Sequence, residues 1–288
     1  MSRTARWIFV VTVVVVTAIF TRLGIWQLHR LSERKTANAR QVARRDLPPL
    51  RIPGELGPAD LPMARTPGAA GGAAGTRGPA GGARPDSARR DTLAWRKALL
   101  AGRYDYGREI VIRDRSWTGA PGVYLLTPLL VRSGGDSAAV LVLRGWLPSG
   151  DAFHARLSVG RPGEGAEGAE GADTASAATF REVSALLLPG HPAEELRIDT
   201  IQGPDGPHPV VAHVDPGRLA ALLPYPVADL YAQVTDSAPP GGYPVRIALP
   251  ELGNGPHLSY AIQWFTLALI SVVGGVIFLR ASGGGGSR

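Results

Sequence analysis

The feature that most constrains this chain is an uncharged run near its C-terminus, from Leu258 to Leu279. At about 1.5 Å rise per residue, a helix of that length crosses a hydrocarbon core of roughly 30 Å. Polar and aromatic side chains, among them Tyr260 and Trp264, crowd into the first two turns. Inside lipid such side chains are costly, so they belong at the headgroup level or around a polar ligand. The run predicts a transmembrane helix over residues 257–279.

A second apolar run lies near the N-terminus, where residues 7–21 carry no charge. Arg22 interrupts it before a further apolar stretch that ends at Leu28. If Arg22 snorkels to the interface, the span covers residues 7–28. The alternative is a cleaved signal peptide, but the small-residue motif at residues 37–39 lies too far beyond the run for ordinary processing. We therefore expect an uncleaved anchor, followed by a polar, basic helix that stops before Pro48.

Basic residues suggest the orientation of the two spans. They flank the first span on both sides, so they do not decide its orientation. Beside the second span, basic residues lie only at the C-terminal end, at Arg280 and Arg288. By the positive-inside rule, we expect both termini in the cytoplasm. Residues 29–256 would then form an external domain, and residues 280–288 a flexible cytoplasmic tail.

The net charge of +7 raises the possibility of a nucleic-acid partner. Much of the excess lies in residues 30–45 and 84–90, beside a membrane and in a linker, where it suits anionic headgroups. We therefore expect the lipid bilayer, and no nucleic acid, as the partner of this charge. The chain has no cysteine, which excludes disulfides, cysteine-ligated zinc and covalent c-type haem, but not a haem held by histidine.

The external segment contains two low-complexity stretches, residues 66–90 and 162–178. Each has too little apolar surface to offset the entropy lost on folding, so both are predicted to be disordered insertions. Short apolar runs bounded by Gly, Pro, Asp and Ser clusters predict strands. These runs cover residues 98–104, 109–113, 122–130, 140–147, 183–188 and 230–235. A short helix is expected over residues 215–223, capped by Asp215. The predicted fold is an α+β membrane protein: two terminal transmembrane helices flanking one mostly antiparallel β sheet or small barrel.

Three motifs carry a resemblance to a known family. They are Leu23-Gly24-Ile25-Trp26-Gln27-Leu28-His29-Arg30, Arg144-Gly145-Trp146-Leu147-Pro148 and His257-Leu258-Ser259-Tyr260-Ala261-Ile262-Gln263-Trp264-Phe265. With the two terminal spans, they resemble the Surfeit-locus (Surf/Shy) family of cytochrome c oxidase assembly proteins. The resemblance implies a bacterial inner-membrane protein that is not an enzyme. It implies haem a as a transient cofactor, and the large oxidase subunit and the haem a synthesis machinery as partners.

On a helix, His257, Tyr260, Ala261 and Trp264 share one face. Imidazole is a common axial ligand of haem iron, and an aromatic face suits a flat porphyrin. The resemblance implies that His257 is the candidate ligand of the haem iron, with Tyr260 and Trp264 beside it. The alternative is that these residues form only an interfacial aromatic belt.

On the first span, the candidate cofactor-binding residues are Trp26, Gln27 and Arg30. Arg30 could bind a haem propionate through a charge-assisted pair, or equally a lipid phosphate. Gly24 is expected to allow close approach of the two spans, and His29 to be solvated.

In the β domain, Gly145 is expected to permit a bulge or a close backbone approach, and Trp146 to pack in the core or at an edge. The remaining histidines, His154, His191, His208 and His213, are expected to be surface or packing residues. No catalytic set is recognisable.

Three other functions compete with haem delivery. The first is a protein scaffold that grips an oxidase assembly intermediate without haem. The second is a haem-modifying membrane enzyme, which usually needs several intramembrane histidines, whereas only His257 lies in or beside a span here. The third is a generic envelope protein whose spans merely anchor it.

Overall fold

The computed structural model describes residues 2–64, 85–150, 180–192, 195–203, 206–237 and 243–283. The chain divides into two compact units. The first combines residues 1–43 with 250–288, and the second covers residues 44–249. The predicted insertion at 162–178, and residues 66–84 of the other, lie outside the described residues.

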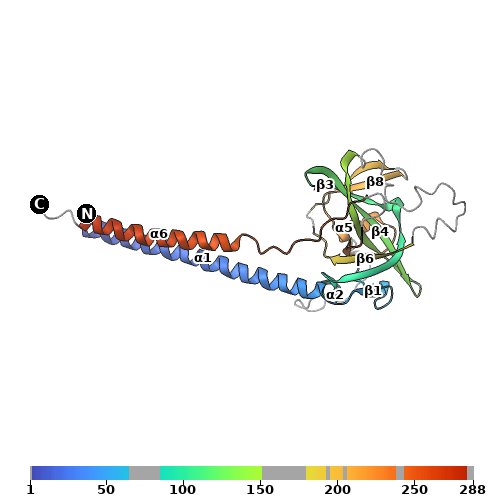
Figure 1. The fold of residues 1–288 in the computed structure, drawn as a ribbon, viewed down its shortest axis with the longest axis horizontal. Helices are drawn as coiled ribbons and strands as arrows, with labels where there is room; N and C mark the ends of the chain where they lie inside the picture. Colours follow the sequence, from blue (N-terminus) through green and yellow to red (C-terminus); the bar gives the residue numbers. More distant parts are fainter. Residues whose placement is uncertain are drawn as a thin grey trace, which may run out of the picture. The chain divides into compact units, whose positions relative to one another are not determined.

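The first unit contains two long helices, α1 (Arg3–Arg45) and α6 (His257–Gly283), which run antiparallel to each other (Figure 1). Both are long and apolar enough to cross a membrane. α1 continues past its apolar part for more than four turns, as the polar, basic sequence after Leu28 predicts. Both predicted terminal helices are therefore present.

Aromatic and small side chains join the two helices. The rings of Phe9 and Phe278 lie 4.6 Å apart between centroids, and those of Phe20 and Trp264 lie 5.7 Å apart. Between apolar helices in lipid, association depends on close packing, which small residues permit. At Gly24, an added Cβ would come within 2.8 Å of the Phe265 ring, so the expected close approach at this glycine is confirmed.

The second unit is built on one nine-stranded sheet (Figure 1). Its strands are β1 (Leu50–Ile52), β2 (Lys97–Tyr104), β3 (Ile110–Trp117), β4 (Ala120–Ser133), β5 (Asp136–Pro148), β6 (Phe180–Leu188), β7 (Asp199–Gly203), β8 (Gly206–Val211) and β9 (Val227–Val234). The helical pieces are α2 (Pro85–Leu93), α5 (Pro216–Leu219) and the 3-10 turns Pro58–Asp60, Tyr106–Arg108 and Ala220–Leu222.

Five of the strands close into a barrel. The order β2-β6-β9-β5-β4 returns to its start because β2 also pairs with β4, through Arg103–Leu130 and Tyr104–Leu129. At Gly102 a Cβ would overlap the Leu130 carbonyl oxygen, so glycine is required where the two strands meet. The expectation of a small, mostly antiparallel barrel is confirmed, with three parallel pairings: β1–β2, β3–β8 and β5–β9.

The core lies on both faces of β5. Its residues 138–147 are buried without interruption, which is the burial pattern of a strand covered on both sides. Val140 and Val142 pack with Leu100, Leu129 and Leu187 in one cluster. Leu141 and Leu143 belong to a second cluster, which also holds Leu219 of α5.

Several elements differ from the sequence-based expectation. Residues 85–90, expected to be disordered, are helical as part of α2, which begins with a proline at its first position, where no amide hydrogen bond is lost. β1, β7 and β8 were not expected. β8 contains prolines 207 and 209, which are rare inside strands, so its sequence does not read as a strand, although it lies between β3 and β7 in the sheet. The helix expected over 215–223 is split into α5 and a 3-10 turn, although Asp215 caps it as predicted by accepting from the Arg218 amide.

The barrel closure can be tested at Gly102. We expect Gly102→Ala to destabilise the protein by about 1–3 kcal/mol, because the new methyl group must displace the backbone of β4. Gly107→Ala is the control, because a Cβ there would meet only Asp105 Oδ1 at 3.6 Å. Chemical unfolding of the full chain in detergent, followed by tryptophan fluorescence, measures both. Equal midpoints would show that β2 and β4 do not meet as described.

Candidate functional site

The site centres on a pair of side chains from the two ends of the chain. His257, the first residue of α6, donates from Nδ1–H to Oε1 of Gln27 on α1 over 3.0 Å. Both side chains are half-buried. With Nδ1 protonated, the lone pair of the neutral imidazole lies on Nε2. The pair therefore fixes which ring nitrogen can accept or coordinate.

The start of α6 is held against α1 on both sides of His257. On the C-terminal side of His257, Ala261 of α6 is fully buried, and the Phe265 ring packs on Gly24 of α1. On the other side, the Asn38 amide donates to the carbonyl oxygens of Leu252 (2.9 Å) and Gly253 (3.2 Å). The segment before His257 is thus tied to the same helix that carries Gln27.

A recess of about 430 Å³ opens beside His257. Its lining combines the imidazole with charged side chains of α1 and two small residues: Arg30, Glu33, Arg34, Ala37, Gly255 and His257. Arg30 pairs with Glu33 at 3.0 Å, but both side chains are more than half exposed, and such a pair contributes little to stability. An incoming carboxylate could therefore compete with Glu33 for Arg30 at low cost.

Gly255 keeps the space at Nε2 clear. Its φ of +68° is a conformation that glycine adopts readily, and a Cβ there would stand 3.4 Å from Nε2 of His257. An imidazole can hold haem iron through one ring nitrogen, and guanidinium groups can bind carboxylates. The chemistry of His257, Arg30 and Arg34 would therefore fit a haem-type ligand that carries carboxylates.

The structure brings together only part of the predicted site. His257, Gln27 and Arg30 meet at or beside the recess. Trp264 instead stacks on Phe20 of α1, and Tyr260 is 45 % exposed.

The guanidinium carbon of Arg30 lies 5.8 Å from the centroid of the Trp26 ring. Trp26 lines a separate apolar recess together with His29. His29 is exposed, as expected. The three aromatic residues predicted to surround the ligand therefore do not line the recess beside His257.

Sequence reasoning missed Arg34, Gly255 and Asn38. Arg34 follows Arg30 by four residues and so lies on the same helix face, a spacing that could have identified it. Asn38 gave no such signal, because its role depends on a contact with a segment more than two hundred residues away. Gly255 gave none, because its role depends on where the His257 ring lies relative to the loop.

The Arg144-Gly145-Trp146 motif has a structural role in the β domain. Arg144 pairs with Glu109 at 2.9 Å, and both side chains are buried. Thr127 donates its hydroxyl proton to the same carboxylate oxygen, and the rings of Tyr104 and Tyr106 lie 5.8 and 5.0 Å from the guanidinium carbon. Burial opposes the charge on Arg144, but Glu109 and the tyrosines raise its pKa above the ordinary value.

The motif also shapes the backbone. Arg144 is the extra residue of a bulge opposite Leu125 and Leu126. The next residue, Gly145, has a φ of +156°. A Cβ at Gly145 would overlap the Val245 carbonyl oxygen, so the expected close backbone approach is confirmed. Trp146 is buried, and its backbone N–H and carbonyl both bond to Val245 at 2.8 Å, as expected for packing.

Of the other histidines, His208 is fully buried and bonds through Nδ1 to the Glu109 carbonyl over 2.9 Å. His191 and His213 are exposed, so all three agree with the expected surface or packing roles. His154 lies outside the described residues.

Comparison with known proteins gives the family. Residues 14–269 match the model of the SURF1 family. The chain belongs to the SURF1 family. The members of this family are known generally as oxidase assembly factors.

Among its relatives are uncharacterized SURF1-like proteins of Mycobacterium bovis and Mycobacterium tuberculosis, each 26% identical over 180 residues. The matched part is 62% of this chain and 58% of each relative. The family match covers both predicted spans in large part, and all three motifs that carry the resemblance.

The buried ion pair of the β domain generates a prediction. Glu109→Gln should cost about 3–5 kcal/mol, because Arg144 would keep its buried charge without a carboxylate. Asp199→Asn is the matched control: it removes one of the two carboxylate partners of Arg113, in an exposed pair of 3.0 Å, and should cost less than about 1 kcal/mol. Denaturant unfolding of both variants gives the comparison. If the two variants unfold alike, the buried pair does not stabilise the domain.

Proposed function

We propose that this chain is an assembly factor for a haem-copper cytochrome c oxidase, which binds haem a at His257 and assists its insertion into the large oxidase subunit. Its membership of the SURF1 family supports the assembly role. The observation that carries the haem role is the bond from His257 Nδ1–H to Gln27, which leaves Nε2 as the coordinating atom beside Gly255.

In this proposal, both long helices cross the bacterial inner membrane with the two termini in the cytoplasm. The apolar length of α1 and α6 supports the crossing, and Arg280 at the end of α6 supports the orientation. His257 and the recess would then lie at the outer, non-cytoplasmic face of the inner membrane. There a poorly soluble ligand can enter from lipid while its charged groups remain near water.

Each residue of the site would have one role. His257 Nε2 would coordinate iron, and Gln27 would hold the imidazole in the tautomer and orientation that coordination needs. Arg30 and Arg34 would bind the two propionates. Haem a itself supplies the redox-active iron that the oxidase requires. A single protein ligand in an open recess favours release, so the chain would act as a carrier and not as an enzyme.

The central test is the absorption spectrum of the chain purified from cells that make haem a. We expect a haem spectrum in the wild type and its loss in His257→Ala, because the iron loses its only proposed protein ligand. His29→Ala is the matched control, because His29 is exposed near the same end of the spans but does not line the recess beside His257.

A wild-type protein that is colourless whether or not the cells make haem a would refute the haem role. It would instead support the second candidate, a scaffold that stabilises an oxidase assembly intermediate through protein contacts alone. In that candidate, the folded β domain with its buried core would be the part that docks on the intermediate. In both cases, deletion of the gene should reduce oxidase activity and leave other membrane complexes intact.

The role of Gln27 can be tested separately. Gln27→Leu removes the oxygen that accepts from His257, and we expect haem a to bind about 10- to 100-fold more weakly. Gln27→Glu keeps an acceptor oxygen and should bind at least as tightly as the wild type. Titration of the purified variants with haem a, followed by absorbance, measures both. Equal affinity in Gln27→Leu and the wild type would exclude a positioning role.

A further inference from the structure

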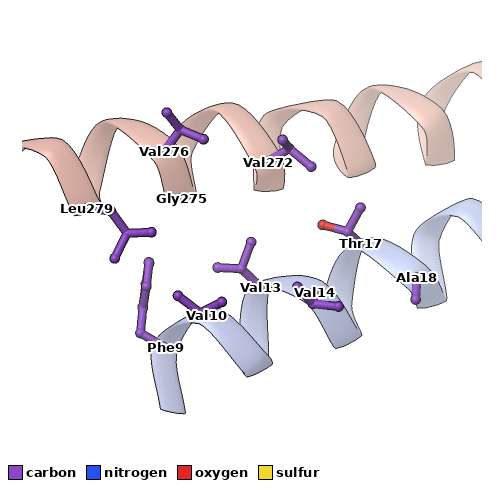
Figure 2. Close-up of a pocket in the computed structure, with 10 residues that line it drawn as sticks. All are labelled: Phe9, Val10, Val13, Val14, Thr17, Ala18, Val272, Gly275, Val276 and Leu279. Carbon is purple, nitrogen blue, oxygen red and sulfur yellow. The ribbon is translucent and has the colours of Figure 1, made fainter. Parts of the chain in front are cut away.

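The pair of long helices carries two recesses of different chemical character. One, of about 400 Å³, lies between α1 and α6 near the start of α1, and its lining is apolar except for Thr17 (Figure 2). The other, of about 590 Å³, lies on α1 alone and contains a charged side chain. This second recess, called the Arg22 recess below, is lined by Ile19, Arg22, Leu23, Ile25, Trp26 and His29.

Arg22 lies on the side of α1 that faces away from α6. Gly24 and Gln27 mark the side of α1 that contacts α6. At about 100° per residue, Arg22 and Trp26 each lie roughly 200° around the helix from Gly24. Both side chains are exposed. α6 therefore does not cover this charge.

The two helices also offer Arg22 no carboxylate. Within the described residues, Arg22 forms no ion pair and no hydrogen bond. The one carboxylate of α1, Glu33, pairs with Arg30 and lies roughly 16 Å along the helix axis from Arg22, and α6 has none. The proposed function places Arg22 inside the first membrane span, where a charge without a partner is costly. The partner should therefore come from the surrounding membrane.

The depth of Arg22 indicates which anion is within reach. Arg22 lies about 9 Å along the helix axis before Leu28, the end of the predicted span. From such a depth, an arginine side chain can extend its guanidinium to the headgroup level. The phosphates of phospholipids lie at that level. A partner helix could satisfy Arg22 only through a carboxylate placed in the membrane, which is itself costly to insert.

The lining of the Arg22 recess matches the two ends of a lipid molecule. Towards the outer face of the membrane, the recess offers the guanidinium of Arg22, the indole of Trp26 and the imidazole of His29. Towards the membrane interior it continues over Ile19, which is 51 % exposed. A phosphate would meet the cation, and an acyl chain would lie over the aliphatic side chains. A headgroup that also carries an ammonium would bring a second cation beside Arg22, so a net negative headgroup fits better.

We propose that the Arg22 recess binds one phospholipid with a net negative headgroup, with its phosphate on Arg22 and its acyl chain along Ile19 and Leu23. The proposal rests on the proposed function, which places α1 across the membrane. The bound lipid would neutralise the one charge inside the span 7–28. It would also fix the depth at which the next turn of α1, with Gln27, lies in the membrane.

The first test is native mass spectrometry of the full chain in detergent, titrated with phosphatidylglycerol. We expect the affinity for the first bound lipid to fall about fivefold or more in Arg22→Gln, the factor that one cation near the headgroups contributes. Arg22→Lys keeps the charge and should retain most of the affinity. Arg6→Gln is the matched control, because Arg6 is an exposed arginine at the other end of the same span and should leave the affinity unchanged.

Three results of this titration would overturn the proposal. The first is equal affinity in Arg22→Gln and the wild type. The second is an equal loss in Arg6→Gln, because binding would then be a general attraction of headgroups to cations. The third is equal affinity of the wild type for phosphatidylglycerol and for zwitterionic phosphatidylcholine.

The second test asks whether a protein covers the recess. The chain has no cysteine, so Ile25→Cys places a single thiol in the recess, and Leu28→Cys places one on the side of Gly24. Each variant is labelled in native membranes with a benzophenone maleimide and irradiated. We expect adducts with lipid from Ile25→Cys. A defined adduct with another membrane protein from Ile25→Cys, and none from Leu28→Cys, would show that a partner helix occupies the recess and would overturn the proposal.

The haem spectrum of the same preparations separates this proposal from the haem role. Lipid binding that depends on Arg22, in a protein that never binds haem, would support the lipid site and refute haem binding. A haem-loaded protein whose lipid affinity does not depend on Arg22 would refute the lipid site alone.

Discussion

The candidate site depends on how closely α1 and α6 approach each other at Gly24. A side chain larger than hydrogen at this position would collide with the Phe265 ring, 2.8 Å from a Cβ. One turn further along α1, Gln27 meets His257 at 3.0 Å. Glycine at this crossing therefore does more than allow packing, because a wider separation would leave the imidazole without its acceptor. In lipid, where no hydrophobic force draws helices together, such close contact is itself the main source of association.

The site combines rigid and replaceable interactions. The imidazole is oriented by a half-buried hydrogen bond, and the segment before it is tied down by Asn38. Arg30, in contrast, is held only by an exposed pair with Glu33, which costs little to break. A carrier needs this combination, since a fixed ligand atom lowers the entropic cost of binding, and loosely held cations can accept and release an anionic group.

The sequence predicted the elements of the fold better than their contacts. One uncharged run of spanning length, one apolar run interrupted only by Arg22, and β runs bounded by turn residues were sufficient to predict both helices and six strands. Strands β7 and β8 were not predicted because many of their residues are polar, glycine or proline. β8 pairs with β3, and β7 pairs only with β8, so both depend on contacts that the sequence does not show. The closing of the barrel was expected only in outline, because the requirement for Gly102 depends on the carbonyl of Leu130.

For the candidate site, helical periodicity placed His257 and Ala261 on one face, and Ala261 does face α1. It could not tell that Trp264 stacks on Phe20 and lies outside the recess, because that depends on the rotation of α6 against α1. The contribution of Gly255 was equally hidden, since a glycine in a loop reveals nothing until the atom beside it is known.

The three motifs that carry the family resemblance are constrained in different ways. Arg144, Gly145 and Trp146 are explained by the β domain alone: a buried ion pair, a bulge and a backbone crossing. His257, Gly24 and Gln27 also have structural roles, but these leave one thing unexplained. A helix end needs no imidazole with its tautomer fixed and its second nitrogen unobstructed, and an interfacial belt would be served as well by tyrosine or tryptophan. The choice of histidine at this one position is therefore the strongest physical reason to look for a metal-centred ligand at the recess.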